Sequence, residues 1–439
     1  MPNALTIAGS DSVGGAGLQA DIKAFEALGI HACSVVTCVT SQNTTGVASI
    51  FPIPAVEVAS QLDSVLSDVK LDAVKTGMLY SEDIVSTVAS RIRKGVGDLV
   101  VDPVMQATTG ASLRSGGLVE ALLTKLVPIC RLITPNVYEA SMLTGIKVTG
   151  ERTARAAAEE LLELGAQAVL LKGGHLKGEE AADYLFFGDK RLKFSTPRAP
   201  LEVHGTGCAL ASLIAGHLAL GRDLEDSVKS SKRMIYRAII ANEMVGKGIP
   251  CANPLATLRA DAHKSDMLEA LEDAGRELET LLDADLVPEV GSNMGYAMPG
   301  ALEADEVAAF DGRIVRAGGG ARRVGCARFG ASKHVARIVL AASLHDPTTR
   351  CALNLKYSKE NLDACKAARL TAEAFDRARE PKGVKSMTWG VHKAIFKHGA
   401  VPDVIYDKGG VGKEPMIRLL GDSPEDVIAK LRRIKSKRR

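Results

Sequence analysis

The sequence has little excess charge, no paired cysteines and no long apolar run, and each absence excludes a class of protein. Its 439 residues carry a formal net charge of +3, which is too small to argue for a nucleic-acid partner. The eight cysteines form no Cys-x-x-Cys pair, so neither a zinc site nor a disulfide framework is supported. No signal peptide is expected, and no apolar run reaches the ~18 residues of a membrane span. We therefore expect a cytoplasmic protein without a membrane partner.

Short apolar runs alternate with helical patterns through the first half of the chain. Several runs are apolar along their whole length, as in strands that are buried on both faces. This alternation predicts an α/β fold with a mostly parallel sheet and helices on both faces of the sheet. The predicted strands are Ala4–Ala8, His31–Thr40, Ala73–Thr76, Leu99–Asp102, Leu132–Pro135, Ala168–Lys172 and Tyr184–Phe187.

A change of pattern after this region indicates a second domain. Residues 245–262 contain glycines and prolines without a period, which predicts a linker. Asp266, followed three residues later by Glu269, fits a capping box at the start of a new helix. We predict a first domain over residues 1–257 and a second, mixed α/β domain over residues 264–439.

Two glycine-rich segments of the first domain lie beside predicted strands. Ala8–Gly17 follows a strand and opens a helix, so its backbone amides could approach a ligand, although a tight strand–helix turn explains it equally well. Lys172–His175 begins at the carboxyl end of a strand, where α/β sheets bind ligands. Lys172 there suits a phosphate; the alternative is a solvated lysine before a turn.

The third glycine-rich segment, His204–Cys208, is the most specific. Gly205, Thr206 and Gly207 precede an apolar helix, so several N–H groups and the helix dipole converge on one point. This arrangement predicts an anion hole for a phosphoryl group in transfer. Cys208 lies at the helix start, where a lowered thiol pKa would let it take a proton from an attacking hydroxyl. The alternative is a small buried cysteine in a tight turn.

Two carboxylates follow predicted strands of the same sheet. Asp102 ends one apolar strand, and Glu139 lies shortly after another. Each could reach Mg²⁺ or its waters beside nucleotide phosphates. A helix cap or a surface position explains either carboxylate alone, but together with the anion hole they favour metal-assisted phosphoryl transfer.

The combination of motifs identifies a family. Residues 3–257 resemble the hydroxymethylpyrimidine/phosphomethylpyrimidine kinases of thiamine biosynthesis, which have the ribokinase-like fold. Most ribokinase relatives carry Asp where Cys208 stands, so the cysteine favours the pyrimidine kinases and nearby vitamin kinases. The matching stretches are Ala4–Asp11, Gly14–Asp21, Gln42–Thr44, Lys75–Met78, Asp102–Met105, Ile133–Asn136, Lys172–His175 and His204–Cys208.

The resemblance implies two successive ATP-dependent phosphorylations, from alcohol to monophosphate and then to pyrophosphate. Gln42 would read the aminopyrimidine edge through paired hydrogen bonds, and Gly9, Asp21 and Met78 would help to line its pocket. ATP would be bound near Lys172, Asp102 and Glu139, with Mg²⁺ held by the two carboxylates. Kinases of this family are usually homodimers. A pyridoxal-type kinase remains the alternative.

The second domain contains a basic region before an apolar run. Gly330–Arg337 reads as a loop that leads into a helix, and five arginines lie just upstream of it. They predict a positive pocket for phosphate or pyrophosphate, or else a solvated basic surface. The glycine-rich loop Asp407–Pro415, which includes Val411, is either a backbone anion nest or an ordinary connection. Ser423 and Pro424 predict the start of a last helix. The five arginines are Arg313, Arg316, Arg322, Arg323 and Arg328.

This second half resembles the archaeal-type thiamine-phosphate synthase domain. The resemblance implies coupling of the pyrimidine pyrophosphate to a thiazole phosphate, with Arg313 and His334 at positions that the family uses for catalysis. The partners would then be small-molecule substrates. A non-catalytic sensor of thiamine phosphate is the alternative. The matching stretches are Pro288–Gly291, Asn293, Gly312–Ile314, Phe329–Arg337, Asn354–Tyr357, Phe375–Arg377 and Gly412–Pro415.

Overall fold

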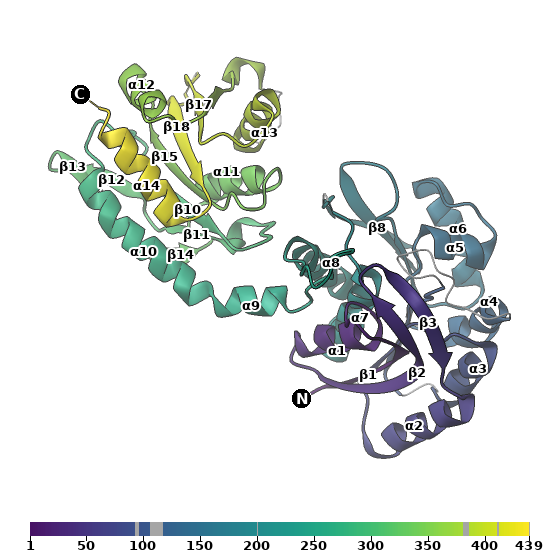
Figure 1. Ribbon diagram of the computed structural model, residues 1–439. Coiled ribbons are helices and arrows are strands. Elements are labelled where there is room, and N and C mark those ends of the chain that lie inside the picture. Colours follow the sequence, from purple (N-terminus) through teal and green to yellow (C-terminus); the bar gives the residue numbers. More distant parts are fainter. Residues whose placement is uncertain (93–95, 106–116, 200, 381–385, 411, 439) are drawn as a thin grey trace. The chain divides into compact units, whose positions relative to one another are not determined.

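The chain forms two compact units, Met1–Leu258 and Arg259–Arg439, each of which is described by itself (Figure 1). The computed structural model describes residues 1–92, 96–105, 117–199, 201–380, 386–410 and 412–438. Val411 of the predicted glycine loop lies outside these ranges. Among the described residues, no helix has both the length and the apolar character that crossing a bilayer requires.

A nine-stranded sheet in the order β3-β2-β1-β4-β5-β6-β7-β8-β9 forms the centre of the first unit. The neighbouring strands β2, β1, β4, β5, β6 and β7 pair in parallel. Strand β3 at one edge and strands β8 and β9 at the other edge pair antiparallel. All seven predicted strands are present, and the predicted fold class is confirmed. The strands are β1 Asn3–Asp11, β2 His31–Asn43, β3 Gly46–Pro52, β4 Ala73–Thr76, β5 Asp98–Val101, β6 Leu132–Ile133, β7 Val169–Lys172, β8 Glu180–Phe187 and β9 Lys190–Pro197.

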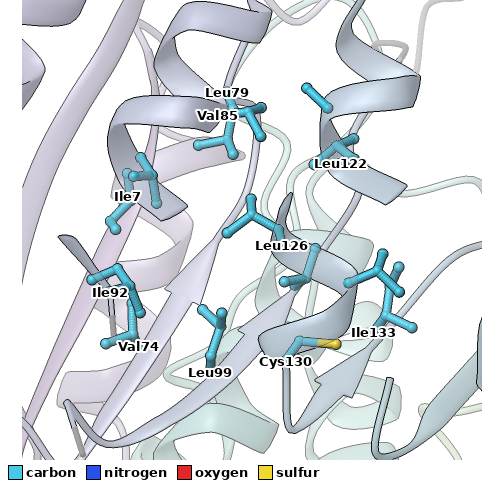
Figure 2. Close-up of a cluster of buried hydrophobic side chains, with 14 of the residues drawn as sticks. Ile7, Val74, Leu79, Val85, Ile92, Leu99, Leu122, Leu126, Cys130 and Ile133 are labelled. Carbon is cyan, nitrogen blue, oxygen red and sulfur yellow. The ribbon is translucent and has the colours of Figure 1, made fainter. Parts of the chain in front are cut away.

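Helices cover both faces of this sheet because successive strand residues point to opposite sides. In β5, Leu99 and Val101 join one buried cluster, whereas Val100 joins another. Figure 2 shows the first cluster, in which Leu99 lies near Leu126 and Cys130. The helices are α1 Gly17–Glu26, α2 Ala55–Asp68, α3 Glu82–Arg91, α4 Leu118–Ala121, the π-helix η1 Leu122–Leu126, the 3₁₀-helix η2 Val127–Ile129, α5 Val137–Thr144, α6 Glu151–Glu163, α7 Thr206–Ala219 and α8 Leu224–Ile240.

The second unit has a seven-stranded sheet in the order β14-β11-β10-β15-β18-β17-β16 and a separate hairpin, β12–β13. Its pairs are antiparallel except for β16 with β17. The strands are β10 Met294–Ala297, β11 Val307–Phe310, β12 Ile314–Ala317, β13 Gly320–Arg323, β14 Ala327–Phe329, β15 Cys351–Lys356, β16 Ala372–Ala374, β17 Val404–Asp407 and β18 Met416–Gly421. The helices are α10 Lys264–Leu281, η3 Ala304–Glu306, α11 Lys333–Ser343, α12 Lys359–Ala367, η4 Arg377–Arg379, α13 Ser386–His398 and α14 Pro424–Lys435.

The segment predicted to be a linker is largely built into the first unit. The backbone N–H of Ile249 donates to the carbonyl of Thr44, and Cys251 forms bridges with His204 and Glu243. The remainder forms a short helix, α9 Ala256–Ala262. The boundary between the two units, after Leu258, does fall inside this segment, but composition did not reveal that part of the segment makes specific backbone hydrogen bonds with the first unit.

The two predicted helix starts in the second unit have opposite outcomes. Ser423 caps α14 by accepting from the Asp426 N–H at 3.3 Å, with a proline in the first turn, as predicted. The capping box at Asp266 is wrong, because α10 already begins at Lys264. Asp266 instead lies inside the first turn, where a carboxylate still interacts favourably with the helix dipole.

Candidate active sites

The start of helix α7 depends on glycine. Gly205 has φ +81°, and a Cβ at this position would lie 1.7 Å from the carbonyl oxygen of Gly15. Both the left-handed backbone and the close approach of the two glycine-rich segments therefore exclude a side chain. Helix geometry leaves the N–H groups of Thr206, Gly207 and Cys208 without acceptors inside the helix. The predicted convergence of N–H groups is thus present in the backbone.

The thiol of Cys208 is half-buried in this first turn. Burial raises the pKa of Cys208 to about 11, although the nearby charge of Lys75 and a hydrogen bond from the Gly17 backbone act to lower it. The carboxylates of Asp102 and Asp21 act in the same direction as burial. The prediction of a lowered thiol pKa is therefore wrong, because it considered the helix dipole and not the apolar and anionic surroundings.

Lys172, at the end of β7, lies directly beside the anion hole. Its Nζ is 3.3 Å from the position that a Cβ on Gly207 would occupy. It forms an ion pair with Asp102 at 2.7 Å, and Oε2 of Glu139 lies 3.9 Å away. Burial acts to lower the pKa of Lys172, but the charges of these two carboxylates outweigh it and raise the pKa. Sequence positions 102, 139, 172 and 207 thus meet at one edge of the sheet.

The two predicted metal ligands differ in how their oxygens are used. Asp102 accepts from Lys172 and Thr134 through Oδ1, whereas its buried Oδ2 has no hydrogen-bond partner among the described residues. Glu139 completes a capping box at α5, where Oε2 accepts from the Asn136 N–H at 2.8 Å. Burial and the charge of Asp102 raise the pKa of Glu139 to about 7, although the charge of Lys172 and the hydrogen bond from Asn136 act to lower it. The Asp102 Oδ2 atom, which has no hydrogen-bond partner among the described residues, and the nearby Glu139 carboxylate fit a Mg²⁺ site whose other ligands are water and phosphate oxygens.

The residues expected around the pyrimidine divide into two groups. Gly9 and Met78 are neighbours, since a Cβ on Gly9 would lie 3.5 Å from the Met78 sulfur and 2.6 Å from Sγ of Cys38. The Gln42 amide reaches from β2 to the ring of His204, with 2.9 Å between the two Nε2 atoms. Asp21 is fully buried.

Asp21 holds a buried ionic network that sequence reasoning did not anticipate. Its carboxylate forms an ion pair with Lys75 at 2.8 Å and accepts hydrogen bonds from Thr6 at 2.6 Å and Ser212 at 2.7 Å. Asp21 and Lys75 are both fully buried. Burial acts to lower the pKa of Lys75, and the Asp21 charge raises it above its usual value. The network therefore places a fixed positive charge near Cys208.

The amides of the first glycine-rich segment are bound by Asp11, which sequence reasoning also missed. The carboxylate accepts from the N–H groups of Val13, Gly15 and Ala16 at 3.1, 3.0 and 2.8 Å. Burial would raise the pKa of Asp11, but the hydrogen bond with His204 and the backbone N–H groups lower it. Of the two interpretations of Ala8–Gly17, the structure favours the tight strand–helix turn.

In the second unit the structure brings Arg313 and His334 together. Arg313 has φ +72°, follows β11, and donates to the carbonyl of Val290. His334 lies in the first turn of α11, which Ser332 caps. Burial of the ring and the charges of Arg418, Arg313, Arg377 and Arg337, in that order, lower the pKa of His334 to about 4.

The arginines around His334 are only partly those that the sequence had grouped. Arg323 forms an ion pair with Glu272, and Arg328 forms one with Asp311. Arg316 donates to the carbonyl of Val287. Of the four arginines that lower the pKa of His334, Arg313 and Arg337 belong to the predicted basic region, whereas Arg377 and Arg418 come from later in the chain.

Hydrogen bonds between distant segments of the chain connect the loops beside Arg313. Glu414 accepts from the backbone N–H groups of Glu289 and Val290 at 2.8 and 3.1 Å. The amide of Asn354 accepts from the N–H of Asn293 at 2.7 Å and donates to the carbonyl of Gly291 at 3.0 Å. Short motifs that are up to 125 residues apart in the chain thus form one connected scaffold next to Arg313.

Comparison with known proteins finds a family match for each of the two units. The phosphomethylpyrimidine kinase family matches residues 11–253, and the thiamine-phosphate synthase ThiN family matches residues 270–433. The bifunctional thiamine biosynthesis protein ThiDN of Methanocaldococcus jannaschii is 33% identical over 97% of this chain and 97% of its own length. The bifunctional protein ThiED of Geobacter sulfurreducens is 46% identical, but the match spans 56% of this chain and 50% of that protein. The ADP complex of Bacillus subtilis pyridoxal kinase has a TM-score of 0.55 and 31% identity, covering 59% of this chain and 99% of that one.

The parallel sheet and the glycine-rich start of α7 define the first unit as a ribokinase-like kinase, which a second α/β domain follows. The chain as a whole belongs to the family of bifunctional thiamine biosynthesis proteins that join a phosphomethylpyrimidine kinase domain to a ThiN-type thiamine-phosphate synthase domain.

Proposed function

We propose that the first unit uses ATP to phosphorylate 4-amino-5-hydroxymethyl-2-methylpyrimidine twice, giving first the monophosphate and then the pyrophosphate. We further propose that the second unit couples this pyrophosphate to a thiazole phosphate, which yields thiamine monophosphate and free pyrophosphate. The observation that carries the proposal is the convergence of Cys208, Lys172 and Asp102 on the helix start at Gly205–Gly207.

In the kinase reaction, the substrate oxygen attacks the terminal phosphorus of ATP as the bond from that phosphorus to its bridging oxygen breaks, and ADP leaves with the electron pair of that bond. The N–H groups of residues 206–208 stabilise the charge on the transferred phosphoryl group, and Lys172 attracts the nucleotide phosphates. Cys208, as the thiolate, takes the proton of the attacking hydroxyl, and the positive charge of Lys75 stabilises that thiolate. Gln42 orients the aminopyrimidine, with Gly9 and Met78 beside it.

Asp102 and Glu139 would hold Mg²⁺ through carboxylate oxygens, with water and phosphate oxygens as the other ligands. The ion would supply charge neutralisation of the nucleotide phosphates. Lys172 would then exchange part of its pairing with Asp102 for contact with the phosphates, since one lysine cannot satisfy two anions at full strength.

In the synthase reaction, the thiazole nitrogen bonds to the methylene carbon of the pyrimidine as the C–O bond to pyrophosphate breaks. The electron pair of that bond leaves with the pyrophosphate, so positive groups must stabilise the departing oxygen. Arg313 supplies such a charge. His334, close to Arg313, would exchange a proton with the departing pyrophosphate or stabilise its charge through a hydrogen bond. We also propose that the protein acts as a homodimer in the cytoplasm, where its substrates are small molecules only.

The test is a coupled assay of the purified full-length protein with ATP, Mg²⁺, hydroxymethylpyrimidine and thiazole phosphate, with the products identified by mass. Thiamine monophosphate formed without another enzyme supports both activities. If the pyrimidine pyrophosphate accumulates, the second unit is a sensor rather than a synthase. If pyridoxal is phosphorylated and the pyrimidine is not, the kinase assignment fails. Size-exclusion chromatography with light scattering tests the dimer.

A further inference from the structure

A buried ion pair joins helix α8 to strand β8 in the first unit. Nζ of Lys232 donates to Oδ2 of Asp183 at 2.7 Å, and the two side chains are 10% and 4% exposed. Taking two charges out of water is costly, and a well-packed apolar pair in the same place often gives equal or greater stability. Stability alone therefore does not explain a lysine and an aspartate at these two positions.

The second oxygen of the same carboxylate binds the loop that follows β7. Oδ1 of Asp183 accepts from the buried backbone N–H of Gly173 at 3.0 Å. Asp183 can reach this group because it lies opposite Lys172 in the antiparallel pairing of β7 with β8. The chain is also crowded here, since a Cβ on Gly173 would lie 2.1 Å from the carbonyl oxygen of Ala182. The carboxylate thus connects α8 with the end of β7.

Hydrogen bonds hold both of the peptide units that flank Lys172. The N–H of Lys172 donates to the carbonyl of Pro135 at 2.8 Å, and the next N–H along the chain is the one that Asp183 binds. Because peptide units are planar, these two hydrogen bonds restrict φ and ψ of Lys172. The backbone dihedrals set the direction in which the side chain leaves the strand. This direction brings Nζ to the start of α7, 3.3 Å from the position that a Cβ on Gly207 would occupy.

We propose that Asp183 and Lys232 are positioning residues of the kinase, which hold Lys172 so that its ammonium group faces the phosphates of the nucleotide. Asp183 fixes the peptide unit that follows Lys172. Lys232 compensates the charge of the carboxylate and orients it. Both residues act through Lys172 rather than through contact with a substrate. This inference rests on the proposed function, because ATP is taken to be the ligand of Lys172.

The experiment compares two double variants that both remove the ion pair and differ only in the hydrogen-bond acceptor. Asp183→Asn/Lys232→Met keeps an oxygen for the Gly173 N–H, whereas Asp183→Leu/Lys232→Met has a side chain of similar shape without one. Isothermal titration calorimetry measures binding of the ATP analogue AMP-PCP with Mg²⁺ to the full-length protein. We expect binding to weaken about tenfold in the leucine variant and by no more than about threefold in the asparagine variant. Glu225→Gln, which breaks the exposed ion pair of α8 with Lys190, is the control and should bind within about twofold of the unsubstituted protein.

Kinase assays on the same variants separate a positioning role from a purely structural one. The leucine variant should raise the KM for ATP about tenfold and the KM for the pyrimidine less than about twofold, because Lys172 faces the nucleotide. Circular dichroism melting curves record the stability of each variant. If the leucine variant does not fold, Asp183→Ala/Lys232→Met replaces it in the comparison.

The inference is overturned if the two double variants bind AMP-PCP equally tightly, or if the KM for the pyrimidine rises as much as the KM for ATP. If AMP-PCP binding depends on the acceptor at position 183 while the pyrimidine is not phosphorylated, the positioning role stands and the proposed function fails. If phosphorylation proceeds without any dependence on that acceptor, only this inference fails.

Discussion

The Cys208 thiol is the residue whose surroundings bear most directly on kinase activity. Its pKa of about 11 means that the thiolate is scarce at neutral pH and becomes more abundant as pH rises. If the thiolate is the base, kcat should rise about tenfold per pH unit from pH 7 towards pH 9. Cys208→Asp should flatten this profile, because a carboxylate stays ionised throughout. Stopped assays of ADP formation would measure both profiles.

Removing the thiol gives a second test of the same role. Cys208→Ala should lower kcat by about 10²–10⁴-fold while changing the KM for ATP little, as expected for loss of a general base. Cys326→Ser is the matched control, since Cys326 is an exposed free thiol in the second unit. An unchanged kcat in Cys208→Ala would show that the thiol only fills space at the helix start.

His334 offers a test of the electrostatics of the second site. Burial of the ring and the charges of the nearby arginines hold the pKa of His334 at about 4, so the ring is neutral at physiological pH. Arg313→Gln removes one positive charge and should raise the pKa of His334 by roughly one unit at most. A histidine NMR titration would measure the change, with Arg328→Gln as the control. No upward shift would mean that Arg313 and His334 do not interact.

At the scale of elements, helix α7 contains a buried histidine that lacks hydrogen bonds within the part of the chain that the structure describes, which lowers the free energy of unfolding. His217 is 2% exposed, and neither ring nitrogen has a hydrogen-bond partner among the described residues. Burial lowers its pKa to about 4, with a contribution from Arg222. Because the unfolded state then binds the proton more readily, stability is full above the unfolded pKa of about 6.5 and is lost as pH falls from there to about 4.

We therefore expect His217→Leu to weaken the acid sensitivity of the protein. The pH-dependent loss assigned to His217 is on the order of 3 kcal/mol between pH 6.5 and pH 4. Urea unfolding at pH 7 and pH 5, followed by fluorescence and circular dichroism, would compare the variant with the unsubstituted protein. His31→Leu, at an exposed histidine in the same unit, is the control. Equal acid sensitivity of the two variants would contradict the assignment.

The helices also show how far local sequence signals extend. Ser423 and Pro424 predict the start of α14 because the cap and the first turn are local. Glu139 shows the limit of this approach, since one carboxylate serves both as the reciprocal partner of the Asn136 cap and as a neighbour of Lys172. The edge strands β3 and β9 were missed because they are half-exposed and lack a continuous apolar run.

At the scale of the whole molecule, each of the two compact units has its own buried clusters. We expect fragments 1–258 and 259–439 to fold separately. The first fragment should phosphorylate the pyrimidine, and the second should couple supplied pyrimidine pyrophosphate to thiazole phosphate. Circular dichroism and the two assays on separately purified fragments would check this. A fragment that stays unfolded alone, but folds when its partner is added, would contradict it.

The sequence by itself determined the fold class, the positions along the chain of seven strands of the first unit, and the motifs of both sites. Buried parallel strands and glycine-rich loops are specified by local composition, so they can be read along the chain. Tertiary structure decided which groups face one another. It made Asp21 the partner of Lys75, gathered Arg377 and Arg418 around Asp407, and surrounded Cys208 with groups that raise its pKa. Such pairings join residues from separate strands and helices, so the free energy of burial and charge depends on the completed fold rather than on any one segment.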